Sequence, residues 1–386
     1  MIRAYADGSL IYDSRMEEDG LLGIKTVRGV NKGGKAEIVL PPDHSAYDRF
    51  IPYRTVVEIY RDTTLKFRGR FLYSEDDFDR LRTLVCEGEL CFLQDAVSRP
   101  RLYRGSPRDI LTDIITDYNT QVEPFKRFYV GSVTVKDPYG SLYLETNYAE
   151  SVLETVRSFI KRYGGYITFS THEASGRRLI HWLADMGKDC SQVIEIGENL
   201  FDFTRSGADT ELCTALIPYG AKLADTGKRL TVSDVNGGVD IIKDSAAIRT
   251  YGTITKTVVW DDVTLPGVLL DKARRYLRDH NSVVTSLELT AFDLSYVDRS
   301  LDSFEVGDRV RVRSAPHGLD EYFRINDVEE NLFDPEDGLL NLGKEVYSLT
   351  GLGAEADRNA RNLLNQEVAD LQRRLEALEA AARNAV

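Results

Sequence analysis

Hydrophobic and polar residues alternate with a period of two over most of residues 37–95. The alternating segments read "AEIVLP", "TVVEIY", "LKFRGRFLY" and "TLVCEGELCFL", and Pro, Asp and Gly residues separate them. A period of two is typical of β-strands with one buried face. The pattern therefore predicts a small antiparallel β unit in this part of the chain.

The pattern changes to a helical period at Ser106, which can cap a helix that has Pro107 at its first position. One apolar stripe follows, consisting of Ile110, Leu111, Ile114 and Ile115. A second helix is predicted in "NYAESVLETVRSFIKRYGG", where Asn147 and Glu150 have capping-box spacing and Gly164 can end the helix. The segments "GYITFS" and "RRLIHWLA" then predict a hairpin packed on that helix.

Strand patterns return after residue 195. Predicted strands are "TALIPYGA", "KRLTVSDV" followed by an Asn236-Gly237 turn, "SLELTAFDLS", "DRVRVRS", "EYFRINDVEENLF" and "EVYSLT". One helix, "LPGVLLDKARRYLRDH", interrupts them. This region is therefore a second β unit with a helical insert.

The two β regions resemble each other. In the first, "VVEIYRD" leads to "KFRGRFLYSEDDF" and "TLVCEGELCFL"; in the second, "RVRVRSA" leads to "EYFRINDVEENLF" and "LNLGKEVYSL". The three blocks have the same order and approximately the same spacing in both regions, which indicates two copies of one β module around an α/β insertion. Chance similarity among short amphipathic strands is the alternative.

The chain ends in a leucine-spaced segment after a linker, "GLGAEADRNAR". Its apolar positions follow the a/d spacing of a coiled coil and predict a seam formed by Leu364, Val368, Leu371, Leu375, Leu378 and Ala382. About three heptads are too few to be stable alone, so this helix needs support from the body of the protein or from partners.

Composition is that of a globular protein, with 42% hydrophobic and 10% aromatic residues. No segment reaches the ~20 apolar residues of a membrane span, and the N-terminus is too polar for a signal peptide. We therefore expect synthesis in the cytoplasm. The formal charge of −13 disfavours tight capture of nucleic acid, because such binding depends on Lys and Arg neutralising phosphates.

Candidate chemistry is sparse. Cys86, Cys91, Cys190 and Cys213 have neither zinc-site nor redox spacing and are interpreted as free core thiols. His172-Glu173 lacks the second His of a zinc-protease motif, and His317 lies in a Pro-Gly turn without a nucleophile nearby. The acidic pairs in "WDDV" and "SEDDF" are interpreted as solvated turns. The sequence predicts no catalytic, cofactor-binding or metal site.

Several longer stretches resemble one family. They are "LPPDHSAYDRFIPYRTVVEIYRD", "FRGRFLYSEDDFDRLRTLVCEGELCFLQDAVSRP", "EIGENLFDFTRSGADTELCTALIPYGA", "LTVSDVNGGVDIIKDSAAIRTYGTI" and "AFDLSYVDRSLDSFEVGDRVRVRSAPHGLDEYFRI". Over about residues 38–350 they resemble, in the same order, the hub region of phage tail-tip proteins of the tail-associated lysin or prophage endopeptidase tail family.

The resemblance implies a homotrimeric baseplate hub at the virion tail tip. Two barrel-like tube modules in each of three subunits would give six modules that continue the sixfold tail tube. The implied partners are further copies of the chain, the distal tail protein and tail tube, the tape-measure protein, a central spike, fibre or lysin, the host envelope, and DNA in transit. Family members that carry a cell-wall hydrolase have it C-terminal to the hub, so no catalytic residue is transferred to this chain.

The predicted fold is thus α+β and β-rich. Its parts are a first tube module at 1–97, an α/β insertion at 98–195, a second tube module with a helical insert at 196–350, and a linker with a coiled-coil stalk at 351–386. The interpretation is structural rather than enzymatic, with a tail-associated cell-wall endopeptidase and a receptor-binding tail adhesin as alternatives. A puncturing spike fits less well, since no repetitive β-helix pattern follows residue 350.

Overall fold

The computed structural model describes residues 1–343, except residues 17, 137–142, 147, 173, 208–211, 224–226, 262 and 283–284. The last predicted strand, "EVYSLT", lies outside the described residues, as do the linker and the coiled-coil stalk. The predicted seam therefore remains a prediction; it comprises Leu364, Val368, Leu371, Leu375, Leu378 and Ala382.

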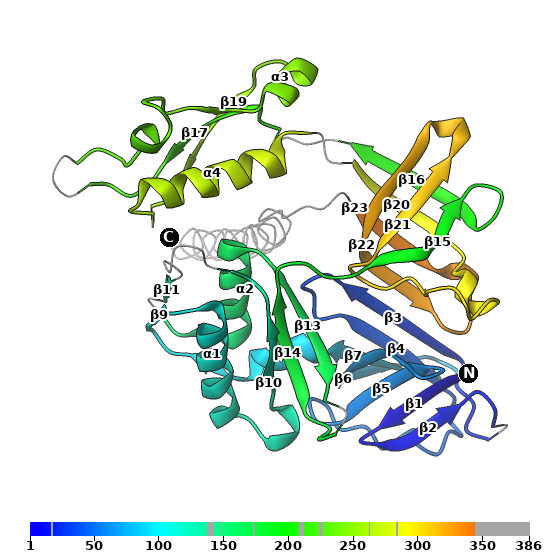
Figure 1. Ribbon diagram of the computed structural model, residues 1–386. Coiled ribbons are helices and arrows are strands. Elements are labelled where there is room, and N and C mark those ends of the chain that lie inside the picture. The colour runs from blue at the N-terminus through cyan, green and yellow to red at the C-terminus, as the bar shows by residue number, and fades with distance from the viewer. Residues whose placement is uncertain are drawn as a thin grey trace, which may run out of the picture.

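One curled sheet runs through both β regions and has 13 strands among the described residues (Figure 1). The N-terminal part, which we call module 1, contributes β1 (Ile2–Ala6), β2 (Ser9–Asp13), β3 (Gly23–Gly29), β4 (Lys35–Leu40), β5 (Val56–Arg61), β6 (Thr64–Asp76) and β7 (Arg82–Gly88). Its strand order is β3-β4-β7-β6-β5-β1-β2. Apolar side chains from alternate positions, such as Ile38, Ile59 and Leu84, form its core.

The C-terminal part, module 2, contributes β15 (Asp189–Glu195), β16 (Leu200–Gly207), β20 (Thr285–Ala291), β21 (Arg309–Ser314), β22 (Leu319–Asn331) and β23 (Leu339–Gly343). Its order is β16-β20-β23-β22, with β21 beside β22 and β15 beside β21. The sequence places residues 189–195 in the α/β insertion, but β15 pairs in parallel with β21 and so belongs to this sheet.

The two modules repeat one strand order. Strands β3-β4-β7-β6-β5 of module 1 match β16-β20-β23-β22-β21 of module 2, and each set follows the same order along the chain. The registers also match. Thr26, Ala36, Cys86 and Phe71 form one row across four strands, and Arg205, Leu287, Leu342 and Ile325 form the equivalent row.

The long central strands β6 and β22 carry the most detailed part of this repeat. Both have 13 residues, and each contains an irregularity directly after the row residue, between Phe71 and Tyr73 or between Ile325 and Asp327. Both also hold a buried arginine one residue before the row, Arg70 or Arg324. These agreements support the predicted duplication by features that the sequence comparison did not use.

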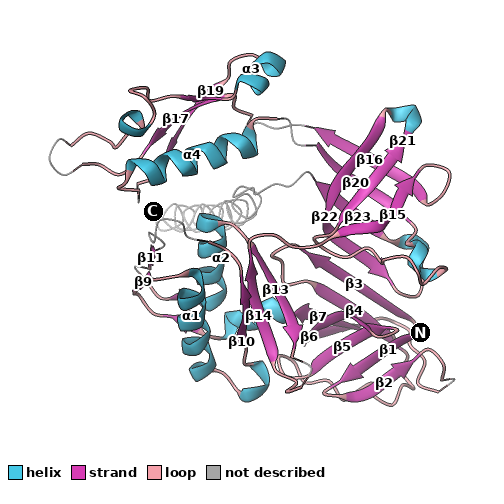
Figure 2. Ribbon diagram, viewed as in Figure 1, coloured by secondary structure: helices cyan, strands magenta, loops and turns pink. Residues whose placement is uncertain are grey.

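The α/β insertion follows module 1 and packs two helices against a three-stranded sheet (Figure 2). Its elements are the 3-10 helices η1 (Glu89–Asp95) and η2 (Pro124–Lys126), the helices α1 (Pro107–Gln121) and α2 (Val152–Tyr163), and the strands β8 (Val97–Ser98), β9 (Leu102–Arg104), β10 (Tyr129–Val133), β11 (Tyr143–Glu145), β12 (Glu150–Ser151), β13 (Tyr166–Thr171) and β14 (Arg178–Leu183). The predicted hairpin is confirmed, since β13 and β14 pair antiparallel.

Both predicted helices of this insertion form, with one error at a cap. Ser106 caps α1 in a capping box with Asp109, as the sequence allows. Helix α2 begins later than predicted, because the hydroxyl of Ser151 accepts the Glu154 N–H and thereby caps it. The predicted partner Glu150 lies in β12, where its carboxylate accepts a hydrogen bond from the Thr155 hydroxyl.

A second insertion separates β16 from β20 and has its own small sheet. It consists of β17 (Ala215–Tyr219), η3 (Ser233–Val235), β18 (Ile242–Lys243), α3 (Ser245–Tyr251), β19 (Thr255–Val259) and α4 (Pro266–His280). The predicted helix is α4. The predicted strand "KRLTVSDV" is wrong: apart from an isolated bridge between Lys222 and Arg229, the segment is irregular and ends in η3.

The fold is mostly β with few helices, which confirms the coarse fold class. The prediction of two separate barrel-like modules is not confirmed, because the modules share one sheet in which β3 pairs with β22. None of the described helices has the length and apolarity needed to cross a membrane.

Candidate functional site

The histidines singled out in the sequence lie in turns, as predicted. His172 is exposed between β13 and β14, with its Nδ1 3.0 Å from the Ser175 hydroxyl. His317 ends the 3-10 helix η5 (Ala315–His317), and its Nδ1 lies 2.6 Å from the Ser314 hydroxyl. In the part of the chain that the structure describes, no group of three His, Cys, Asp or Glu residues could hold a metal ion.

The four cysteines are free thiols, and three of them lie in environments that suppress the thiolate. Cys86 is fully buried in β7, and burial raises the pKa of its thiol far above the ordinary value. Burial also raises the pKa of Cys91 to about 12 and that of Cys190 to about 11. Since the thiolate is the nucleophilic form, these cysteines are poorly suited to catalysis.

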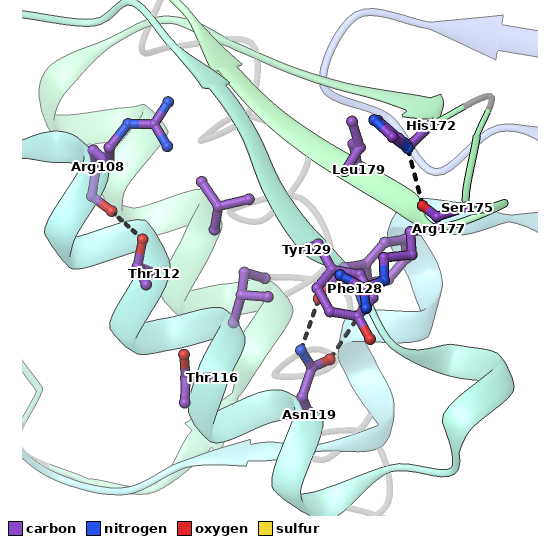
Figure 3. A pocket seen from close by; sticks show the side chains of 12 residues that line it. Arg108, Thr112, Thr116, Asn119, Phe128, Tyr129, His172, Ser175, Arg177 and Leu179 are labelled. Carbon is purple, nitrogen blue, oxygen red and sulfur yellow. Dashed lines mark hydrogen bonds between the residues drawn. The ribbon is translucent and has the colours of Figure 1, made fainter.

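A pocket of about 520 Å³ opens in the α/β insertion between α1 and the β10–β14 edge (Figure 3). Most of its polar groups already have partners within the protein. Asn119 binds the backbone N–H and carbonyl of Phe128, at 3.1 and 2.7 Å, and Arg108 donates to the Gly131 carbonyl. The Arg177 guanidinium covers one face of the Tyr129 ring, 4.5 Å from its centre. Groups that are already hydrogen-bonded or stacked in this way stabilise the local fold, and few polar groups remain to bind a ligand.

The most distinctive arrangement is the junction where the two modules meet. Residues 25–29 of β3 pair antiparallel with residues 327–331 of β22, with Thr26 opposite Glu330. The ladder continues at both ends, because Val30 N–H donates to the Asn326 carbonyl and Leu332 N–H donates to the Ile24 carbonyl, each at 2.9 Å. The Leu332 side chain is buried in the core of module 1.

A largely buried ionic cluster spans this junction; the Glu305 side chain, 33% exposed, is its most accessible member. Module 1 supplies Arg28 from β3 and Lys66 from β6, and module 2 supplies Glu305 and Glu330. The Lys66 side chain is only 1% exposed, and its Nζ lies 2.7 Å from a Glu305 oxygen and 3.6 Å from a Glu330 oxygen. Arg28 pairs with both carboxylates. The charges therefore complement each other across the junction, bases on one module and acids on the other.

Arg61 extends the cluster from β5 of module 1. Its guanidinium lies 3.3 Å from Glu330, 3.4 Å from Asp293 and 4.0 Å from the centre of the Tyr296 ring. The Tyr296 hydroxyl in turn donates to Glu330 at 2.9 Å. The Glu330 carboxylate of module 2 therefore lies within ion-pair distance of three cations of module 1, and it accepts a hydrogen bond from one hydroxyl of its own module.

Electrostatics keep the cluster ionised. Burial alone would raise the pKa of Glu305, but the charges of Arg28 and Lys66 outweigh burial and lower that pKa to about 2. At the solvent edge, Lys25 pairs with Glu329 at 3.0 Å and Lys32 pairs with Asp327 at 2.7 Å. A buried pair adds little net stability, but the loss of either partner is costly, because it leaves an uncompensated charge. The junction can therefore fix the relative orientation of the modules.

Sequence reasoning missed this cluster, since its members come from segments separated by more than 200 residues and no local motif marks them. The predicted functional residues, those of the coiled-coil seam, lie outside the described residues, and their pairing stays a prediction.

Comparison with known proteins agrees with the predicted resemblance. Residues 188–350, which span module 2 and its insertion, match the family described as prophage endopeptidase tail. No curated protein sequence matches the chain.

Three solved prophage and tail proteins share the fold. The prophage tail protein gp18 of Listeria monocytogenes EGD-e is 13% identical, with a TM-score of 0.59 over 92% of this chain and 98% of that one. The 43 kDa tail protein of prophage MuSo2 from Shewanella oneidensis is 14% identical, with a TM-score of 0.58 over 90% and 99%. A tail protein from Neisseria meningitidis MC58 is 12% identical, with a TM-score of 0.60 over 90% and 97%. The chain is thus similar to phage tail proteins in sequence over module 2 and in fold over nearly its whole length.

Proposed function

We propose that this chain is the structural hub of a bacteriophage tail tip. It forms a homotrimer that continues the tail tube, closes it before infection and opens for DNA passage, and it anchors a central spike, fibre or lysin. The observation that carries the proposal is the duplicated module, repeated in strand order, register and bulge position, in a chain that is similar to phage tail proteins.

Duplication suits the task of matching two symmetries. A chain with two equivalent modules presents six modules in a trimer, so a threefold structure can meet a sixfold tube. That match requires a fixed angle between the modules of one chain. The shared sheet and the buried ionic cluster of Arg28, Lys66, Glu305 and Glu330 supply such a fixed junction.

Net charge supports a passive role toward DNA. Each chain carries a formal charge of −13, so a trimer carries three times that value. Acidic residues on the inner wall of a ring would repel phosphates and let the genome slide through without binding. A measured or calculated inner-wall potential that is strongly positive would contradict this part of the proposal.

We further propose that these residues have no hydrolytic activity of their own, although the family name includes an endopeptidase. The pKa of each of Cys86, Cys91 and Cys190 is raised, and the two turn histidines are bound to serine hydroxyls. Zymography of the purified chain on peptidoglycan tests this point directly. Clearing of the substrate would favour the alternative of a tail-associated cell-wall hydrolase.

The location in the particle is tested by labelling intact virions with an antibody against the chain and viewing them by electron microscopy. Label at the distal end of the tail is expected. Label along the tube, on the capsid or on lateral fibres would refute the assignment as a hub, whatever the oligomeric state of the purified chain.

A further inference from the structure

Module 1 and module 2 differ at one edge of their long central strands. In module 2, the second half of β22 is covered by β3 of module 1. In module 1, β5 pairs with β6 only as far as Arg70, and within the described residues no strand covers Tyr73–Asp76 on that side. Tyr73, Ser74, Glu75 and Asp76 are all exposed. The equivalent edge is therefore filled in one module and open in the other.

Phe78 marks this open edge most clearly. The matched registers of β6 and β22 make Phe71 equivalent to Ile325. Phe78 follows Phe71 by as many residues as Leu332 follows Ile325, so Phe78 is equivalent to Leu332. Leu332 is 2% exposed and buried in the core of module 1, whereas Phe78 is 99% exposed. A fully exposed phenylalanine at the position of a buried anchor indicates a missing partner.

The matching partner strand is present in module 2. β16 is the module 2 equivalent of β3, and it ends the sheet on the side away from module 1 (Figure 1). It has eight residues, its Phe201 is 57% exposed, and its outer edge has no strand partner among the described residues. Soluble proteins usually shorten, charge or cover such an edge to prevent unwanted pairing.

We propose that β16 of one chain pairs antiparallel with the second half of β6 in a second copy of the same chain, reproducing the β3–β22 junction between molecules. The row of residues sets the register: Thr26 lies opposite Glu330 in the existing junction, so Arg205 lies opposite Asp76 of the next copy. Ser206 then faces Glu75, and Phe78 enters the core of module 2 near Phe203, the equivalent of Ile24.

Charge complementarity favours this occupant. In the existing junction, basic residues of β3 and the turn after it meet the acidic second half of β22. The second half of β6 ends in the acidic segment Glu75, Asp76 and Asp77, in which Asp76 already pairs with Arg82 of β7 at 2.7 Å. The facing position of β16 is the exposed Arg205, which would add a second cation beside this segment. The segment "SEDDF" thus acquires a role as an assembly edge instead of a solvated turn.

Such a contact is head to tail, because it joins two different surfaces of one chain, and it therefore generates a ring or an open filament. The choice of a closed ring of three rests on the proposed function. The pairing itself rests on the repeated registers, the two open edges, the exposed Phe78 and the charges of the facing segments.

The test compares the self-association of the wild-type chain with that of Phe78→Asp by sedimentation velocity over a concentration series. Because Phe78 is fully exposed within one chain, the substitution leaves the fold intact, which circular dichroism checks. Loss of a central aromatic anchor should weaken association roughly 30-fold or more. Tyr148→Asp, at another exposed aromatic residue, is the matched control and should associate like the wild-type chain.

A disulfide test fixes the register. Chains carrying Asp76→Cys alone and Arg205→Cys alone are mixed and oxidised, and a disulfide-linked pair is expected only in the mixture. Asp202→Cys in place of Arg205→Cys moves the thiol by about 10 Å along the strand and should not link.

Unchanged association of Phe78→Asp, linking of the Asp202 control as readily as Arg205, or a wild-type chain that stays monomeric at its highest soluble concentration would each overturn the pairing. These outcomes leave the hub assignment to the virion labelling, so the two proposals can fail separately. If the disulfide forms between positions 76 and 205 but the antibody does not label the tail tip, the pairing is supported and the hub assignment is refuted.

Discussion

Glu330→Gln should selectively open the junction between the two modules. The Glu330 side chain is 10% exposed and lies within ion-pair distance of Arg28, Arg61 and Lys66. Glutamine keeps the shape and can still accept the Tyr296 hydroxyl, so the substitution removes one charge and little packing. Three cations then share Glu305 and Asp293 in a buried site.

The expected magnitude follows from burial. Removing one partner of a buried ion pair costs about 3–5 kcal/mol, because the remaining charge stays desolvated without compensation. The neighbouring residue gives a matched control: Glu329 pairs with Lys25 at 3.0 Å, but both side chains are more than a third exposed. Glu329→Gln should therefore cost about 0–1 kcal/mol.

Native-state hydrogen exchange is the suitable assay, since a chain with five separate hydrophobic clusters among its described residues need not unfold in one step. The informative amides are those of Val30 and Leu332, which extend the β3–β22 ladder. Glu330→Gln should lower the free energy of opening at these two amides by about 3–5 kcal/mol. Amides in the core of the α/β insertion should keep their protection. Equal losses in the two variants, or a loss below about 1 kcal/mol for Glu330→Gln, would refute the view that the buried cluster holds the modules together.

Three further predictions concern separate parts of the chain. The pKa of Glu305 is lowered to about 2 from a usual value near 4.3. The full shift corresponds to about 3 kcal/mol, but the side chain is 33% exposed, so after solvent screening we expect a contribution of about 1–2 kcal/mol that is present above pH 4.3 and lost as the pH falls toward 2. Urea unfolding at pH 5, 4 and 3 should show this loss in the wild-type chain and not in Glu305→Gln. Ser151→Ala should destabilise α2 by about 1 kcal/mol, because the Glu154 N–H loses its cap, and unchanged protection of the first-turn amides would contradict it. Replacing Leu371 and Leu375 with Asp should loosen the predicted stalk while the β ring still assembles; complete loss of the trimer by light scattering would show instead that the coiled coil nucleates assembly.

Local patterns predicted the elements whose signals lie within a few residues. Helix α1 has its cap, its proline and its apolar stripe within one short segment, and the structure has all three where the sequence puts them. Helix α2 was misplaced at its start, because Asn147-Glu150 and Ser151-Glu154 have the same spacing, and β12 occupies the earlier turn. The segment 228–235 has strand-like alternation, but its apolar residues Leu230 and Val232 pack under α4 instead of joining a ladder.

Long-range features could not be predicted in the same way. The pairing of β15 with β21 and of β3 with β22 joins segments more than 100 residues apart, and the alternation within a strand does not identify its neighbour. The same holds for Lys66 and Glu305, which read as ordinary surface residues until the strands are paired. The internal repeat is the exception: aligning Arg70 with Arg324 aligns the two long strands, and it could have indicated their common topology.

The placement of the two insertions supports the idea that the repeated sheet is the part of the molecule that assembles. The α/β insertion begins where β7 ends, and the second insertion replaces the short turn that connects β3 to β4 in module 1. An insertion at a turn or after a terminal strand leaves the hydrogen-bonded ladder between strands intact. The two modules therefore differ in what they carry at their ends, while the rows across their strands, the bulges in β6 and β22, and the buried arginines stay in register. If the repeat served only to build one core, an open edge and an exposed Phe78 in one copy would have no purpose and would carry an aggregation risk. They are explained if the junction inside the chain is also the pattern for the junction between chains.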